Sequence, residues 1–264
     1  MLSKHKKTLF LNIVYICTVT LFIFPIKALA IVNMNALSFD NIKNTFVADM
    51  DLAISGASGN NDRTKTVLNA QFTWLAKKSI NLAVLGYQYG KNNNVQSENK
   101  AFIHYRYIYQ LNNIMDLELF TQLENNEFTR LSYRGLVGSG LRFSMAKSKH
   151  HHAFLGVGAF YSKEKIEFIS GLTDDGIEKF SRANLYYLSK YDTNTSISFS
   201  NVIYYQPRLS QFSDYRALLE SKIDFKINEN LSFRLSIDIS HDSEPSQNIE
   251  RTDISYKSGL KFNF

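Results

Sequence analysis

The amino-acid sequence predicts an all-β protein: a transmembrane, antiparallel up-and-down β-barrel of about 12 strands behind an N-terminal export signal. Three observations predict this fold. The chain begins with a basic and then apolar segment, the remainder shows a hydrophobic period of two, and the connections alternate between short and long. Aromatic residues make up 14% of the 264 residues, which argues against a disordered chain, and the single cysteine excludes a disulfide scaffold.

The first 30 residues have the pattern of a secretory signal peptide. Its parts are the basic residues Lys4, Lys6 and Lys7, the apolar run 9–26, and the small-x-small cleavage site formed by Ala28 and Ala30. The run is also near the length of a bilayer-spanning anchor, which is the alternative. Pro25 and the cleavage site favour removal of the segment. We therefore expect a signal peptide at 1–30, a short periplasmic leader at 31–44 and a barrel domain at 45–264.

Beyond residue 44 the alternation places apolar and polar side chains on opposite faces of successive strands. The predicted strands are 45–55, 64–75, 80–89, 100–111, 114–124, 130–145, 152–162, 179–188, 195–205, 214–226, 231–240 and 251–264. Most spans are near the roughly nine to eleven residues that a tilted strand needs to cross a bilayer. In the third, eighth and ninth strands both rows are apolar, which indicates a bulge or a partly apolar inner wall.

The connections give an independent indication. They are short at 76–79, 112–113, 146–151, 189–194 and 228–230, and mostly longer at 56–63, 90–99, 163–178, 206–213 and 241–250. This asymmetry is typical of outer-membrane barrels, whose periplasmic turns are short. A water-soluble β-sandwich or lipocalin-like barrel also alternates, and is the competing fold. Aromatic residues near the strand ends, such as Trp74 and Tyr109, favour the membrane barrel because they suit its interfacial girdles.

The last strand ends on an apolar row that resembles the C-terminal signal of proteins inserted by the bacterial barrel-assembly machinery. The row contains Tyr256, Leu260, Phe262 and Phe264. We expect this machinery and outer-membrane lipids as partners, and a bacterial outer-membrane location with both termini in the periplasm. Four of the six net positive charges lie within 1–30, so the nearly neutral remainder does not indicate a nucleic-acid partner.

Several stretches resemble one bacterial family. They are Gly59-Asn60-Asn61-Asp62, the segment NEFTRLSYRGLVGSGLRF at 126–143, Tyr205-Gln206-Pro207, Asp214-Tyr215-Arg216, His241-Asp242-Ser243 and Arg251-Thr252-Asp253. In this order they resemble the salt-induced outer membrane proteins over nearly all of the chain after the signal. The resemblance implies an outer-membrane barrel of unassigned function and supplies no catalytic residue.

The polar row of the strands predicts what the lumen contains. Its candidate lumen-lining residues are Arg106, Glu118, Gln122, Arg134, Arg142, Glu220, Lys222, Arg234, Asp238 and Lys257. Charges inside a barrel must be hydrated or paired, so the lumen is either water-filled or closed by ion pairs. The first case predicts a narrow passive channel for small hydrophilic solutes. The second predicts a structural or surface-interaction barrel.

Patterns that suggest other chemistry are weak. Ser139 lacks the flanking glycines of a nucleophile elbow, so a lipid hydrolase is a distant third hypothesis. The contiguous residues His241, Asp242 and Ser243 cannot converge on one atom. The histidines at 150–152 and the acidic loop around 174–178 match no metal-binding spacing. We expect no enzyme activity, no cofactor and no metal site.

Overall fold

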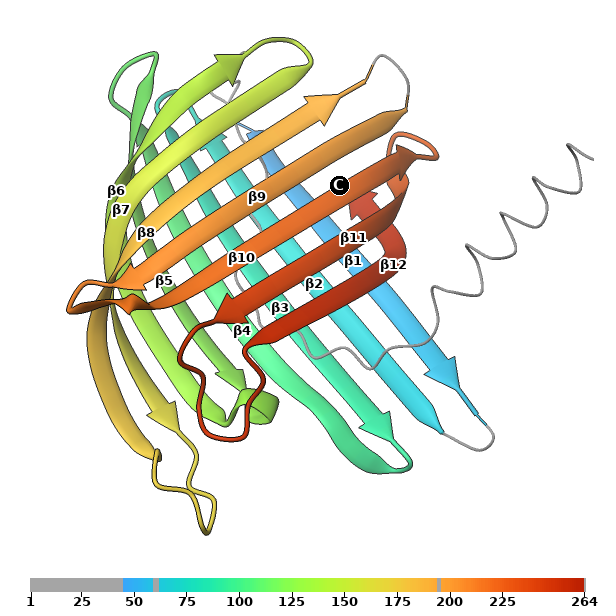
Figure 1. The fold of residues 1–264 in the computed structure, drawn as a ribbon. Helices are drawn as coiled ribbons and strands as arrows, with labels where there is room; N and C mark the ends of the chain where they lie inside the picture. Colours follow the sequence, from blue (N-terminus) through green and yellow to red (C-terminus); the bar gives the residue numbers. More distant parts are fainter. Residues whose placement is uncertain (1–44, 59–61, 194–195, 264) are drawn as a thin grey trace, which may run out of the picture.

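A computed structural model describes residues 45–58, 62–193 and 196–263, and these form a closed antiparallel barrel of twelve strands (Figure 1). The predicted signal peptide, the leader and Phe264 lie outside the described residues. The strands are β1 (Thr45–Ala57), β2 (Arg63–Ala76), β3 (Ser79–Asn92), β4 (Val95–Gln110), β5 (Met115–Asn126), β6 (Leu131–Lys147), β7 (His151–Ile166), β8 (Gly176–Asp192), β9 (Ile197–Arg208), β10 (Gln211–Lys226), β11 (Leu231–Asp242) and β12 (Thr252–Asn263). A short 3-10 helix, η1 (Glu127–Thr129), follows β5. Within the described residues no helix has the length and apolarity needed to cross a membrane.

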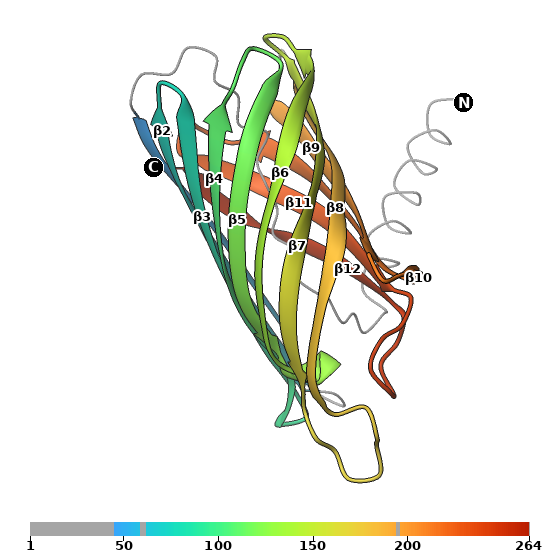
Figure 2. The ribbon, with the colours of Figure 1, turned by 90° about the vertical axis from the view of Figure 1, so that its left-hand side faces the viewer.

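Each strand pairs with its sequence neighbours, and β1 pairs with β12 to close the wall, as the sequence predicts. Both described chain ends and the short connections 77–78, 111–114, 148–150 and 227–230 lie at one end of the barrel, which we call the turn end. The opposite end, the loop end, carries the longer segments 167–175 and 243–251. Figure 2 shows the strands strongly tilted along the wall, with the segment between β7 and β8 projecting furthest.

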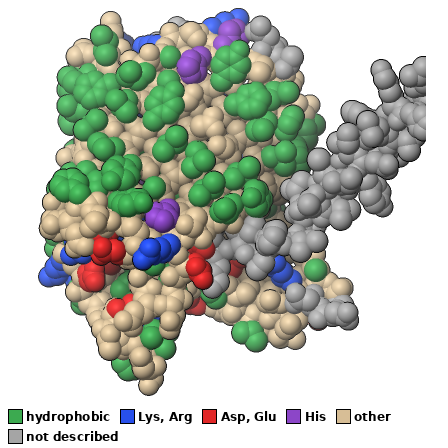
Figure 3. Space-filling view, in the orientation of Figure 1, with side chains coloured by type: hydrophobic (Ala, Val, Ile, Leu, Met, Phe, Trp, Pro, Cys, Tyr) green, Lys and Arg blue, Asp and Glu red, His purple; other side chains and the backbone are tan. Residues whose placement is uncertain are grey.

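The outside of the wall is an apolar band. Outward residues such as Leu119, Val137 and Ile203 are each about half exposed, at 47%, 61% and 49%. In Figure 3 hydrophobic side chains are spread in patches over the visible wall, and acidic and basic side chains gather mainly below them, toward the loop end. A surface of this kind is stable against lipid and not against water, so the protein is a membrane-spanning barrel. The soluble β-sandwich and the lipocalin-like barrel are excluded because the apolar face points outward.

The inner wall is partly apolar, which explains the strands whose two rows could not be separated in the sequence. Inward residues from β3, β8 and β9 meet inside the barrel, together with one each from β7 and β10. They form a cluster of Leu82, Val84, Phe154, Tyr186, Leu188, Val202, Tyr204 and Leu218, with Phe102 packed against it. Glycines make room for the rings, because a Cβ on Gly138 would collide with Phe120 and one on Gly156 with Tyr186.

Two predicted loops are largely strand. The segment 90–99 is reduced to a turn at Asn93 and Asn94, both at positive φ (48° and 62°), and 206–213 is reduced to residues 209–210. The prediction was wrong there because the strands continue past the apolar band. At that height both faces meet water, so the polar–apolar alternation that marks a strand disappears from the sequence while the backbone pairing continues.

Candidate functional site

All ten predicted lumen residues lie on the inner face, but the interior divides into two unlike halves. The inner faces of β4 to β9 form a filled half, which contains Arg106, Glu118, Gln122, Arg134 and Arg142. The inner faces of β10 to β12 and β1 to β3 form a cavity half, which contains Glu220, Lys222, Arg234, Asp238 and Lys257. The first set is packed among other side chains and the second set lines open space.

The centre of the filled half is an ion pair enclosed by aromatic rings. Arg106 Nη1 lies 3.1 Å from Glu118 Oε2, and the two side chains are only 3% and 2% exposed. The guanidinium stacks 4.9 Å from the ring centre of Phe120, and Tyr186 donates a 2.7 Å hydrogen bond to Glu118 Oε2. A buried charge pair needs such additional partners to offset its desolvation. This part of the lumen is therefore closed.

A second enclosed pair lies nearer the turn end. Arg142 donates from Nε (2.9 Å) and Nη2 (2.7 Å) to Asp116 Oδ2 and stacks 4.3 Å from the ring centre of Phe154. Its side chain is 1% exposed. Asp116 was not among the predicted residues, although its position opposite Arg142 on the neighbouring strand follows from the register.

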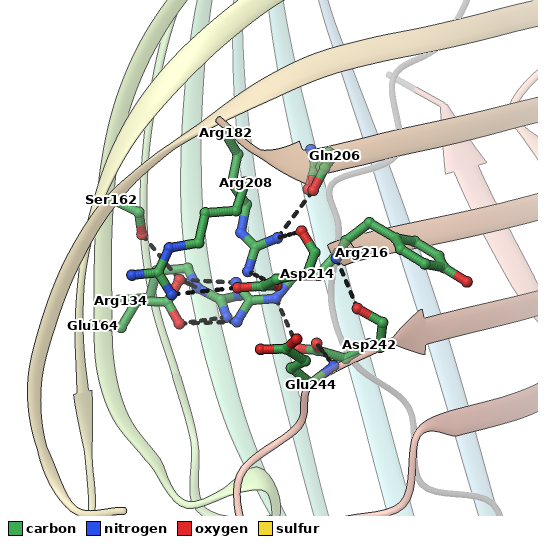
Figure 4. Close-up of polar contacts among 12 residues, drawn as sticks. Arg134, Ser162, Glu164, Arg182, Gln206, Arg208, Asp214, Arg216, Asp242 and Glu244 are labelled. Atoms are coloured by element: carbon green, nitrogen blue, oxygen red, sulfur yellow. Dashed lines mark hydrogen bonds and ion pairs between the residues drawn. The ribbon is translucent and has the colours of Figure 1, made fainter. Parts of the chain in front are cut away.

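The loop end of the filled half is closed by a charge network centred on Glu164 (Figure 4). Glu164 Oε1 accepts from Arg134 Nε at 2.7 Å and from Arg216 Nη1 at 2.8 Å, and Ser162 donates to the same atom at 3.0 Å. Arg134 also pairs with Glu124. Arg216 Nε reaches Asp242 Oδ2 at 2.8 Å. One carboxylate thus joins β6, β7 and β10 across the interior.

A neighbouring group extends this network across β8 and β9. Arg182 Nη2 donates to Asp214 Oδ1 at 2.6 Å, and Arg208 Nη1 lies 3.3 Å from Asp214 Oδ2. Both guanidinium groups lie 4.8 Å from the ring centre of Phe180. Sequence reasoning missed Glu164, Arg182 and Asp214 as lumen residues. Glu164 was missed because the predicted strand ended at residue 162, although the alternation through Phe160, Ser162 and Glu164 marks it.

The cavity half encloses a cavity of about 110 Å³. Four acidic and four basic side chains line it: Asp49, Asp51, Glu220, Asp238, Lys222, Arg234, Lys257 and Lys261. They form short pairs around its wall. Lys257 Nζ lies 2.6 Å from Asp238 Oδ2, Arg234 Nη1 lies 2.7 Å from Asp51 Oδ2, and Lys222 Nζ lies 2.5 Å from Glu220 Oε1. The lining is balanced in charge and also contains apolar residues such as Val84, Phe102 and Leu218.

Gln88 separates this cavity from a second one nearer the loop end. It lines both, and its side chain is buried. The second cavity has a volume of about 10 Å³, which is room for about one water molecule. Glu98, Lys100 and Asp253 also line it. Gln88 therefore lies between the two cavities.

At the loop end of the barrel, Arg130 forms hydrogen bonds to two loops. Its Nη1 donates to Asp174 Oδ1 (2.6 Å) and to the carbonyl oxygen of Gln247 (3.2 Å), and its Nη2 donates to the carbonyl oxygen of Glu167 (2.9 Å). Asp174 Oδ2 accepts from the backbone N–H of Gln247 at 2.6 Å. The segments 167–175 and 243–251 are joined by this side chain and by direct hydrogen bonds of Gln247 to Thr173 and Asp174.

Although its slight burial favours the neutral acid, the pKa of the Asp174 carboxyl is held below its usual range by the Gln247 N–H and the Arg130 guanidinium. Because the pKa of Asp174 is lowered, the contact stabilises the loops fully at pH values above the ordinary carboxyl pKa of about 3.9. That stabilisation is lost as the pH falls through the lowered value.

Arg130→Ala should loosen the contact between the two loops, because it removes three of the hydrogen bonds that hold them together. Hydrogen bonds to a charged group contribute about 1.5 kcal/mol or more each, so the Gln247 amide should exchange its hydrogen at least about tenfold faster. Hydrogen exchange read by mass spectrometry measures this. Arg251→Ala removes an exposed arginine from the same loop and serves as the control, for which we expect no change. Unchanged exchange at Gln247 in Arg130→Ala would contradict the role of Arg130.

The residues considered for other chemistry do not converge. Ser139 lies on the outer face of β6, and His241 points outward on β11 whereas Asp242 points inward. His150 Nδ1 contacts the carbonyl oxygen of Asp192, and His151 Nε2 contacts Ser189 Oγ. Within the described ranges no group of three or more His, Cys, Asp or Glu side chains could hold a metal ion.

The fold and the interior define a membrane-spanning β-barrel of the outer-membrane type whose lumen is half filled and half open. The chain belongs to the family described as "Protein of unknown function, DUF481", whose model matches residues 50–264. That description does not mention salt, so the resemblance to salt-induced proteins stays a prediction.

Solved structures with a similar fold are outer-membrane proteins. The NanC porin structure is 10% identical with a TM-score of 0.50, and the match covers 82% of this chain and 98% of that one. The translocator domain of the autotransporter NalP from Neisseria meningitidis is 8% identical with a TM-score of 0.51, covering 86% and 91%. The KdgM porin is 12% identical with a TM-score of 0.44, covering 83% and 99%. The search of curated proteins found no match. At these identities the likeness concerns the fold alone.

Proposed function

We propose that this protein is a narrow passive channel for small hydrophilic solutes in the bacterial outer membrane, with both termini in the periplasm. The observation that carries the proposal is the cavity half, a space lined by four acidic and four basic side chains inside a membrane-spanning wall. A lumen of this kind admits water and small polar molecules without a strong preference for either charge. A porin among the proteins of similar fold agrees with this function.

The route follows the cavity half. It enters at the turn end near Asp49 and Lys261, whose carboxylate and ammonium groups lie 3.3 Å apart. It continues through the 110 Å³ cavity, passes Gln88 and reaches the smaller cavity beside Glu98. Because only about one water fits at the smaller cavity, this point limits conduction and restricts the channel to small solutes.

Gln88→Ser should raise the single-channel conductance of the refolded, signal-free protein in a planar bilayer, because a shorter side chain widens the narrowest point. Gln122→Ser is the matched control: it shortens a glutamine of similar exposure (7% against 6%), but in the filled half. We expect Gln122→Ser to conduct like the unchanged protein. Equal conductance of all three proteins would place the route elsewhere, and no conductance in any would reject the channel.

The second candidate is a structural or surface-interaction barrel that does not conduct. The Glu164 network favours it, because several cross-lumen ion pairs close the loop end of the filled half. A folded barrel that resists heat on a gel but stays silent in the bilayer would support this candidate. Binding partners would then be sought at the joined loops 167–175 and 243–251.

A further inference from the structure

The closure between β1 and β12 is incomplete. Residues 49–52 of β1 pair with residues 260–263 of β12, all in the part of the seam toward the turn end. On their other sides both strands are paired over nearly their whole length, β1 with β2 and β12 with β11. Beyond Leu52 and Leu260 the facing edges separate, and in Figure 1 the blue β1 and the red β12 diverge toward the loop end.

The cavity extends into this separation. On β10 and β11 the residues that line it are alternate ones, as expected for one face of a strand: 218, 220 and 222, then 234, 236 and 238. On β12 they are five consecutive residues, 257–261, on β1 they are 49 and 51–53, and on β2 they are 67 and 69–71. The cavity therefore reaches the facing edges of β1 and β12, including the outward positions Leu52 and Leu260.

The outward residues of this lining face the lipid. Leu52 and Leu260 are each 41% exposed on the outer surface and also line the cavity. The residues next to them on the two strands, Asp51 and Lys261, point inward and line the same cavity. The seam therefore changes from apolar on its outer side to charged on its lumen side.

Backbone edges that separate at membrane depth are tolerated only where they are buried in protein or line a water-filled cavity. We infer that the β1–β12 seam is a lateral portal between the cavity and the surrounding lipid. Its ligand is an amphiphile with a zwitterionic head group. The head lies among the four acidic and four basic groups of the cavity, and the apolar chain passes between Leu52 and Leu260 into the membrane.

The charge balance of the lining selects the head group. A zwitterion presents both signs of charge to a wall on which basic and carboxylate groups alternate, such as the Lys257–Asp238 and Arg234–Asp51 pairs. The four carboxylates would repel an anionic head group, and the four basic groups would repel a cationic one. This inference shares the membrane-spanning wall with the proposed channel but does not require conduction.

Fluorescence quenching by bromine on lipid acyl chains tests the portal. The probe is bimane on Ser236→Cys, an inward residue of the cavity, in the signal-free protein, which lacks Cys17 and so has no other cysteine. Ser221→Cys on the outer face of β10 gives full lipid exposure, and Gln122→Cys gives an inward site in the filled half. Heat-shifted migration on a gel verifies that each labelled protein has folded.

In vesicles of brominated phosphatidylcholine, bimane at Ser236 should lose at least half the fluorescence that bimane at Ser221 loses, and bimane at Gln122 should lose almost none. Quenching at Ser236 as weak as at Gln122 would overturn the portal. Brominated phosphatidylglycerol should quench Ser236 less than phosphatidylcholine does, whereas equal quenching would overturn the zwitterionic head group. Quenching at Ser236 in a protein that does not conduct would reject the channel and keep the portal.

Discussion

Glu164→Gln is expected to lower the free energy of unfolding by about 3 kcal/mol. Removing one partner of a buried ion pair costs about 3–5 kcal/mol, because the other charge stays buried without compensation. Glu164 serves two arginines, Arg134 and Arg216. We take the lower end of the range because those arginines keep 15% and 17% of their side-chain exposure. The glutamine keeps the shape of the side chain, so the effect isolates the charge.

Urea unfolding of the refolded barrel in vesicles measures this change. Glu178→Gln is the matched control, because Glu178 is 57% exposed and lies 4.0 Å from its nearest partner, Arg208. Exposed pairs contribute about 0–1 kcal/mol, so the control should unfold almost like the unchanged protein. Equal destabilisation by the two substitutions would show that the Glu164 network does not hold the loop end together.

Lys257→Glu is expected to make the channel cation-selective. The substitution changes the charge of the cavity lining from balanced to an excess of two negative charges. Each unit charge acts on a passing ion with about 1 kcal/mol at a distance of about 4 Å in water, which corresponds to a factor of about five, so the ratio of cation to anion permeability should rise at least about fivefold. The reversal potential in a salt gradient across a planar bilayer measures this ratio.

Lys163→Glu makes the same charge change on the outer face of β7 and should leave the reversal potential unchanged. An equal shift in both variants would mean that the surface charge, and not the cavity, sets the selectivity. Arg142→Glu is unsuitable for this test. Arg142 lies beside Asp116 in closed space, so a second carboxylate there should prevent folding instead of altering selectivity.

The two halves of the interior explain why a channel and a closed barrel were both consistent with the sequence. Arg106 and Lys257 look alike in the alternating pattern, since both are basic residues on the polar row. Arg106 is enclosed by Phe120 and Tyr186, whereas Lys257 lines the cavity. The hypothesis of ion pairs that close the lumen describes β4 to β9, and the hypothesis of a polar passage describes β10 to β12 with β1 to β3.

The alternating pattern of polar and apolar residues does not identify the inner face where the inner wall is itself apolar. The apolar second row of the third, eighth and ninth strands was noticed in the sequence, but its meaning was open between a bulge and an apolar inner wall. Leu82, Tyr186 and Val202 pack together inside the barrel, which decides for the inner wall. Their positions along three strands that are not all adjacent are related by the curvature of the wall, which no local pattern records.

By itself the sequence determined the wall of this protein: the strands, their order, the lipid-facing row and the inward direction of the charged residues. It could do so because a period of two reports which face a side chain occupies. Only the tertiary structure decided which inward side chains meet, that Gln88 lies between the two cavities and where β1 and β12 separate. Those features depend on the strand register and on the closure of the sheet, which bring together residues as distant as Asp51 and Arg234.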